Sequence, residues 1–231
     1  MKKIMFNDKY CLTQAVLDGA KTMTRRILHG TLFWERCPEG MWTDDEIKAW
    51  KKEVDQRLID YSMTDEWPQM KIFAMKHCRY KVGEVVAIAQ SYKSIADERD
   101  EAEAVLDLYK IGDNLLTMDE MGAGWNNKMF VKANLMPHHI RITDVKIERL
   151  QDISDKECLR EGVKRASIGF YAEGVKVKDW EKEAHRETAS GCLKLFPFPR
   201  QAFASLIDKV SGKGTWESNP WVVAYSFELV D

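Results

Sequence analysis

The sequence predicts an α+β fold, in which a small, mainly antiparallel β-sheet or barrel carries flanking helices and long insertions. Apolar runs of strand length occur at 82–89, 140–150 and 221–229, and they need one another for burial. Helical patterns lie between these runs, but without the regular strand–helix alternation of a parallel array. We therefore expect the three runs in one sheet.

The composition is that of an ordinary globular protein. The chain has 231 residues, of which 45% are hydrophobic, and this is enough for a core without disulfide or metal staples. The apolar and aromatic content excludes a disordered chain, and the low glycine and proline content excludes a collagen-like one. No linker separates two cores, so we expect a single elaborated domain over 1–231 with insertions at 30–75, 93–128 and 164–198.

Charge and cysteine usage limit the classes of partner. The formal net charge is −2, whereas proteins that coat nucleic acid through bulk charge are strongly basic, so any nucleic-acid contact needs a local patch. The 5 cysteines are scattered and form no C-x-x-C, which indicates reduced thiols. With no apolar run of membrane-spanning length and no signal-like start, we expect a cytoplasmic protein without a membrane partner.

The first elements are helical. An apolar face over 7–19 predicts a short helix that ends at Gly19, and 21–27 follow as a loop or short strand. The clearest helix covers 43–62, because Thr43 and Glu46 form a capping box ahead of apolar residues at helical spacing, which are Ile47, Trp50, Val54, Leu58 and Tyr61.

The middle of the chain contains the first long strands. A basic stretch over 71–81 precedes the apolar strand 85–89. The acidic segment 94–109 predicts a solvated helix, 112–128 a loop, and 129–131 a short strand. In the strand 140–150 the alternation of apolar residues breaks near Thr143-Asp144, which predicts a β-bulge.

The last third carries a second capping box. Ser154 and Glu157 open a short helix that ends before Gly162. Residues 164–194 show no clean period and indicate an insertion. A helix over 200–210, with Phe203, Leu206, Ile207 and Val210 inward, precedes the final strand 221–229.

The segment most suggestive of chemistry is 17–26, which contains Lys21, Thr24, Arg25 and Arg26 beside the flexible Gly19. Hydroxyls, cations and backbone amides after a helix end can hold a phosphate or a polarised carbonyl. The alternative is a solvated basic turn in which the threonines serve only as caps.

This segment also resembles a known family. Gly19-Ala20-Lys21-Thr22-Met23-Thr24-Arg25-Arg26 is similar to the G-x-K-x-x-T-x-R signature of ASCH domains, members of the PUA-like superfamily, and phage-borne ASCH-like proteins resemble the chain further. The other matching pieces follow in order and lie at 81–86, 142–154 with the helix and Gly162-Val163 after it, and 216–223. Together the pieces cover about half of the chain.

The resemblance implies a small β-barrel with a cleft at one side and a ligand that is RNA or a nucleoside. Minimal bacterial ASCH enzymes are amidohydrolases that remove the acetyl group of N4-acetylcytidine, and they use a Lys and a Thr of the signature and a Glu of the later helix. Carried over by position, these residues are Lys21, Thr24 and Glu161, while Arg26 matches the signature arginine. For Glu161 the alternative is a surface carboxylate at a helix end.

Amide hydrolysis by these residues is chemically consistent. Thr24 would attack the carbonyl or position water, and Lys21 would activate it if burial or the charges of Arg25 and Arg26 lower the pKa of its amine. Glu161 would carry a proton to the leaving amine. Whether the protein is an enzyme stays open, because the chain is longer than the minimal enzymes and has Gln90 and Tyr92 near positions where phage members often carry an acidic residue and a tryptophan.

Other residues are candidates for ligand binding. The residues predicted to line the cleft and bind the ligand are Arg25, Arg26, Lys132, Asn134 and His138. His138 and its neighbour on a strand would point to opposite faces, and no metal-like spacing of ligands occurs, so we expect neither a metal nor a cofactor.

The sequence leaves three classes of function open. The first is an ASCH-type protein that recognises RNA or a modified nucleoside and hydrolyses an N-acyl amide. The second is a non-catalytic RNA- or DNA-binding module, and the third is a structural or interaction protein of phage or prophage origin. The nucleoside, the choice between RNA and DNA, and the oligomeric state stay undetermined.

Overall fold

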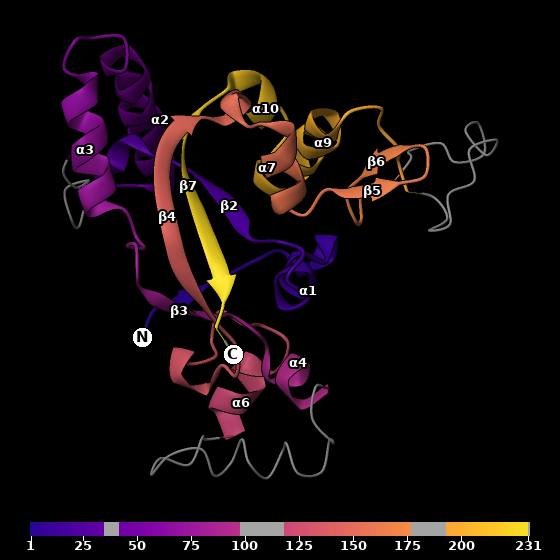
Figure 1. Ribbon diagram of the computed structural model, residues 1–231. Coiled ribbons are helices and arrows are strands. Elements are labelled where there is room, and N and C mark those ends of the chain that lie inside the picture. The colour runs from indigo at the N-terminus through magenta and orange to yellow at the C-terminus, as the bar shows by residue number, and fades with distance from the viewer. Residues whose placement is uncertain (35–41, 98–117, 177–192, 231) are drawn as a thin grey trace.

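The computed structural model describes residues 1–34, 42–97, 118–176 and 193–230. Its main sheet has five strands, which are β1 (Lys3–Ile4), β2 (Met23–Ile27), β3 (Val85–Ile88), β4 (His139–Arg149) and β7 (Trp221–Leu229). Their order is β1-β3-β4-β7-β2, with the long, curved β4 beside β7 (Figure 1). Neighbours pair antiparallel except β1, which pairs parallel with β3, so the sheet is mixed.

The prediction of one sheet is confirmed, because β3, β4 and β7 are adjacent strands. The sheet is not closed into a barrel within the described residues, since the outer strands β1 and β2 do not pair with each other. The fold is therefore mixed α and β with an open, mainly antiparallel sheet.

The predicted β-bulge is also confirmed. The register of β4 against β7 shifts between Ile142 and Asp144. Strand side chains alternate between faces, so an extra residue is needed to bring the apolar residues on both sides of this point to one face. The residues that share this buried face of β4 and β7 are Ile140, Ile142, Val145, Ile147, Val223, Tyr225 and Phe227.

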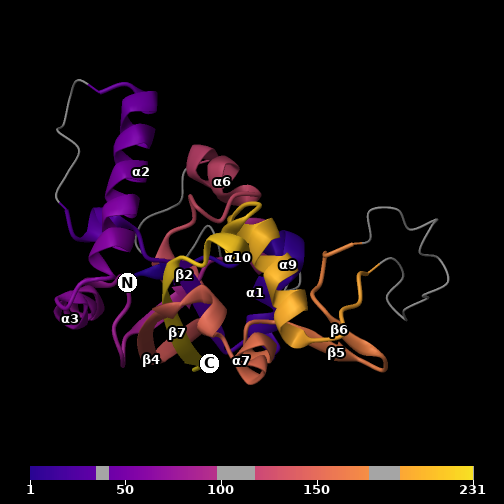
Figure 2. The same cartoon turned by 90° about the horizontal axis from the view of Figure 1, so that it is seen from above.

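Helices flank the sheet in separate groups (Figures 1 and 2). On one side stand α2 (Asp44–Tyr61) and α3 (Trp67–His77), and on the opposite side α7 (Asp155–Arg160), α9 (Pro199–Ser211) and α10 (Thr215–Ser218). A third group, α4 (Tyr92–Asp97) and α6 (Met118–Trp125), lies near the N-terminal end of β4 (Figure 1). The short α1 (Leu12–Leu17) precedes β2, and a two-stranded hairpin of β5 (Lys164–Ala166) and β6 (Gly169–Tyr171) follows α7.

Both capping boxes form as predicted. Thr43 caps α2 with Glu46, and Ser154 caps α7 with Glu157. Helix α9 buries Phe203, as expected, together with Leu206 and Ile207, while Val210 is half-buried.

Several local expectations are wrong. Residues 129–131 form a turn and bends instead of a strand. Helix α6 occupies part of the expected loop 112–128, because packing of Trp125 on a buried cluster overrides the low helix propensity of the glycines in this helix. Helix α3 extends through residues 71–77 of the basic stretch 71–81, for which the sequence predicted no helix. The expected helix 94–109 begins as α4, and its part after residue 97 lies outside the described residues.

A close backbone contact attaches α2 to the segment after β2. The 3₁₀ turn η2 (Gly30–Leu32) packs against α2, and the Gly30 amide donates to Asp55 Oδ1 at 2.6 Å. A Cβ at Gly30 would lie 2.0 Å from the Val54 carbonyl oxygen, which belongs to the helix backbone. Only glycine permits this approach.

We predict that Gly30→Ala lowers the free energy of unfolding by about 1–3 kcal/mol, because neither backbone can yield without separating η2 from α2. Urea denaturation followed by circular dichroism measures this. Gly122→Ala is the matched control, since its Cβ would point into open space on α6, and it should be neutral or raise stability by up to about 1 kcal/mol. Wild-type stability in Gly30→Ala would contradict the packing described.

Candidate functional site

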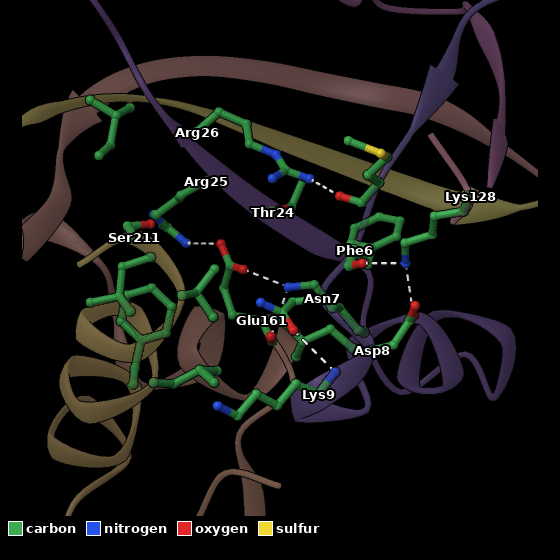
Figure 3. Close-up of a pocket in the computed structure, with 18 of the residues that line it drawn as sticks. Phe6, Asn7, Asp8, Lys9, Thr24, Arg25, Arg26, Lys128, Glu161 and Ser211 are labelled. Atoms are coloured by element: carbon green, nitrogen blue, oxygen red, sulfur yellow. Dashed lines mark hydrogen bonds and ion pairs between the residues drawn. The ribbon is translucent and has the colours of Figure 1, made fainter. Parts of the chain in front are cut away.

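A cavity of about 840 Å³ lies between β2, the N-terminal segment and α9 (Figure 3). Its walls are residues 5–9, residues 24–27 of β2, and the inner face of α9 from Phe203 to Ser211. Lys21 and Glu161 also line it. We call it the α9 cavity.

Lys21 is buried and held by one residue. Its Nζ donates to Glu161 Oε2 at 2.6 Å and to the Glu161 backbone oxygen at 2.7 Å, and both side chains are at least nine-tenths buried. Glu161 is therefore not the surface carboxylate of the alternative interpretation. Residues 140 positions apart in the sequence meet here as an ion pair inside the protein.

Arg25 holds the other oxygen of the same carboxylate. Its Nη1 donates to Glu161 Oε1 at 3.1 Å, and its Nη2 lies 2.5 Å from Glu148 Oε1 and 3.2 Å from Glu157 Oε2. Figure 3 shows Glu161 turned toward Arg25 on the side of the cavity that faces α9. The carboxylate of Glu161 thus bridges Lys21 and Arg25, and each of the three charges has an opposite charge beside it.

Local sequence explains how Glu161 reaches this position. It caps the C-terminal end of α7, and Gly162 follows with a φ of +105°, a left-handed conformation that ends the helix. The Thr22 amide donates to the Arg160 carbonyl at 2.9 Å, and Arg160 Nε donates to Thr22 Oγ1 at 3.0 Å. These bonds fasten the end of α7 to the segment that leads into β2.

The environment changes the acidity of the lysine as the sequence suggested. Burial is the largest effect and lowers the pKa of the Lys21 amine, and the charges of Arg26 and Arg25 lower it further. The Glu161 carboxylate opposes this shift, but the net direction is downward from the ordinary value of 10.5. A lowered pKa increases the fraction of neutral amine, which is the form that accepts a proton or attacks.

Thr24 and Arg26 also face the α9 cavity. Thr24 is 5% exposed, and within the described part of the chain its hydroxyl has no hydrogen-bond partner. The Arg26 guanidinium donates to the Met5 carbonyl and lies 5.9 Å from the centre of the Phe6 ring. Figure 3 shows Arg26 beside Thr24, across the cavity from α9.

The structure thus brings Lys21, Thr24, Arg25, Arg26 and Glu161 to one cavity. It does not place Lys132, Asn134 or His138 there, and the prediction that these three line the same cleft is wrong for this cavity. Their segment is held elsewhere, because its apolar residues pack with β3, α4 and α6, through Val131, Leu135 and Met136.

Sequence reasoning missed the acids that neutralise Arg25. Glu148 and Lys146 occupy the face of β4 opposite its buried isoleucines, and Lys146 Nζ lies 2.9 Å from Glu157 Oε1. Their spacing of two predicts that Lys146 and Glu148 share one face of the strand, but no sequence signal shows which residues cover that face. Lys128 was missed as well; it donates to Asp8 Oδ1 at 2.7 Å at the edge of the cavity.

Two kinds of feature were not found among the described residues. No three His, Cys, Asp or Glu side chains gather there as a metal-binding group. No helix in the same ranges has the length and apolar character needed to span a membrane.

No family model, curated protein or solved structure matches this chain. Function is therefore inferred from the geometry of the α9 cavity and from Lys21, Thr24 and Glu161, which line it.

Glu157 provides a test of the charge network. Burial raises the pKa of this carboxyl, but hydrogen bonds from Ser154 and Lys146 and the charge of Arg25 outweigh burial and lower the pKa to about 2. A folded pKa below the ordinary 4.5 means that the ionised group stabilises the folded state above pH 4.5, and that this contribution is lost as the pH falls toward 2.

We predict that Glu157→Gln, which keeps the cap but removes the charge, lowers the free energy of unfolding at pH 7 by about 1–2 kcal/mol. The difference from wild type should shrink as the pH falls from about 4.5 to about 2. Denaturant titrations at several pH values measure it, with Glu217→Gln on the exposed face of α10 as the control. A loss that stays the same at pH 7 and pH 3 would contradict the charge network.

Proposed function

We propose that the protein is an ASCH-type amidohydrolase that binds a nucleoside carrying an N-acyl group and hydrolyses the amide. The observation that carries the proposal is the buried ion pair of Lys21 and Glu161, at 2.6 Å. It lies in the same cavity as the hydroxyl of Thr24, which has no hydrogen-bond partner among the described residues. These are the positions to which the G-x-K-x-x-T-x-R signature and the later helix assign catalysis.

The fold supports the proposal at the level of a curved, mainly antiparallel sheet with helices on both sides. We propose further that this sheet is a PUA-like barrel left open between β1 and β2. A side chain takes the place of strand pairing at this opening, because Arg26 of β2 donates to the carbonyl of Met5, directly after β1.

The cavity suits a ligand of nucleoside size. Its volume of about 840 Å³ lies in the range of roughly 300–1,000 Å³ that is usual for small-molecule sites. Phe6 and the apolar side chains of α9 offer a surface for a flat base, while Lys21, Thr24 and Glu161 supply polar groups for the acyl amide. Apolar walls with a few convergent polar groups are typical of such sites.

In the proposed reaction the Thr24 oxygen attacks the amide carbonyl carbon, and the hydroxyl proton passes to the neutral amine of Lys21. Among the described residues Lys21 donates to two acceptors, both on Glu161. The neutral amine has two N–H groups, so its lone pair is left to accept this proton. The resulting ammonium lies beside the developing oxyanion and stabilises it.

The tetrahedral intermediate then collapses. The carbon–nitrogen bond breaks, the proton on Lys21 moves to the leaving amine, and the acyl group stays on Thr24 as an ester. Water attacks this ester, gives a proton to Lys21, and releases a carboxylic acid while the proton returns to Thr24. The net change is one amide and one water converted to one amine and one acid.

Glu161 acts through Lys21 in this scheme. Its carboxylate orients the amine, and Arg25 fixes the carboxylate by its second oxygen. The scheme thus differs from the expectation that Glu161 itself carries the proton to the leaving amine, because its carboxylate is paired with both Lys21 and Arg25. A residue that alternately accepts and donates a proton works best when its pKa lies near the working pH, and the lowered pKa of Lys21 moves it in that direction.

We predict that Thr24→Val lowers kcat/KM for N4-acetylcytidine at least about 1,000-fold, because the isosteric change removes the nucleophile. The Kd of the nucleoside should change less than about threefold, since the hydroxyl acts chiefly in the transition state. Mass spectrometry of the released cytidine and acetate measures turnover, and calorimetry measures Kd.

Thr143→Val, on the exposed part of β4, is the matched control and should retain full activity. Turnover at the wild-type rate in Thr24→Val would contradict the mechanism. Binding of nucleosides by the wild type with no turnover of any acylated nucleoside would instead identify a binding module.

A further inference from the structure

A second cavity of about 500 Å³ adjoins the α9 cavity. The two cavities share the lining residues Met5, Arg26, Ile27 and His29, so they are neighbouring compartments on either side of Arg26. The second one extends to Tyr80 and Tyr225, whose rings contact edge to face. We call it the Tyr80 cavity.

The Tyr80 cavity occupies the opening of the sheet. Its lining comes from both outer strands and their continuations, with Lys3 of β1, Arg26 of β2, and Arg79 between α3 and β3. Because β1 and β2 do not pair, strand hydrogen bonding does not fill this space.

The charge of this lining has one sign. Among the described residues that line the Tyr80 cavity, Lys3, Arg26 and Arg79 are cationic, and none is Asp or Glu. The α9 cavity differs, since Asp8 and Glu161 balance cations there. A cavity with only cationic charges in a chain of net charge −2 is a local feature that favours an anion.

The cationic side chains differ in how many hydrogen bonds and ion pairs they form within the described residues. Lys3 Nζ donates to three backbone oxygens, those of Lys128, Met129 and Val131, so this ammonium serves the fold. Arg79 forms no ion pair or side-chain hydrogen bond with the described residues, and its guanidinium lies 5.6 Å from the centre of the Tyr80 ring.

Arg26 and Arg79 repel each other. Burial lowers the pKa of Arg26, and the nearby charge of Arg79 lowers it further, although Tyr80, Glu161 and Tyr225 oppose these effects. Guanidinium groups present paired donors that match the oxygens of a phosphate. An anion between them would relieve the repulsion.

We propose that the Tyr80 cavity binds the phosphate of a nucleotide between Arg26 and Arg79, while the base and acyl group of the same nucleotide fill the α9 cavity. This inference rests on the proposed function, because it assigns the base to the α9 cavity. It makes the substrate a nucleotide instead of a free nucleoside.

The test measures binding to the wild-type protein by calorimetry with cytidine, cytidine 5′-monophosphate, cytidine 3′-monophosphate and inorganic phosphate. At least one monophosphate should bind about tenfold or more tightly than cytidine, and its advantage should shrink as salt rises. Arg79→Gln should remove most of the advantage, whereas Arg165→Gln, an exposed arginine on the β5–β6 hairpin that lines neither cavity, should preserve it.

Equal affinity for cytidine and both monophosphates, or an advantage that survives Arg79→Gln, would overturn the inference. Inorganic phosphate that binds as tightly as the monophosphates would also overturn it, because the site would then hold free phosphate. Failure of the proposed function is distinguishable, since absence of hydrolysis with Arg79-dependent nucleotide binding would contradict only the chemistry, and hydrolysis without phosphate preference would contradict only this inference.

Discussion

The carboxylate of Glu161 is the group on which the site depends. One of its oxygens lies 2.6 Å from Lys21 and the other 3.1 Å from Arg25, all three inside the protein. Removal of one partner from a buried ion pair costs about 3–5 kcal/mol, because an uncompensated charge is left in a medium of low polarity. The end of α7, the start of β2 and, through Glu148, the central strand β4 are therefore held in one arrangement.

The gap between β1 and β2 is the second feature on which the site depends. β1 and β2 do not pair, and the space between them is occupied by the Arg26 side chain and the two cavities on its sides. A closed ladder of backbone hydrogen bonds would leave no room for a ligand at this point. The Tyr80 cavity therefore lies at this gap in strand pairing, and Arg26 separates it from the α9 cavity.

The sequence predicted the parts of the fold that have a strong local signal. The apolar alternation of β4, with its break at Thr143-Asp144, and the capping boxes of α2 and α7 depend on neighbouring residues and appear in the structure. For the candidate site, the residues expected from the resemblance, Lys21, Thr24 and Glu161, line one cavity, and their catalytic roles stay predictions. Glu148 could not be predicted as a partner of Arg25, since their contact depends on strand order. Lys132 was predicted to line the same cleft but does not line the α9 cavity, because the packing of Val131 and Leu135 decides where its segment lies.

The pKa of Lys21 tests the account most directly. It can be measured by NMR titration of the lysine Nζ or Cε signal, assigned by its loss in Lys21→Arg, in the wild type and in Glu161→Gln. We predict a wild-type value below the ordinary 10.5 and a still lower value in Glu161→Gln, because burial lowers the pKa and the carboxylate opposes that shift. A wild-type pKa at or above 10.5, or one that does not change in Glu161→Gln, would contradict the claim that a buried, carboxylate-bridged amine organises this site.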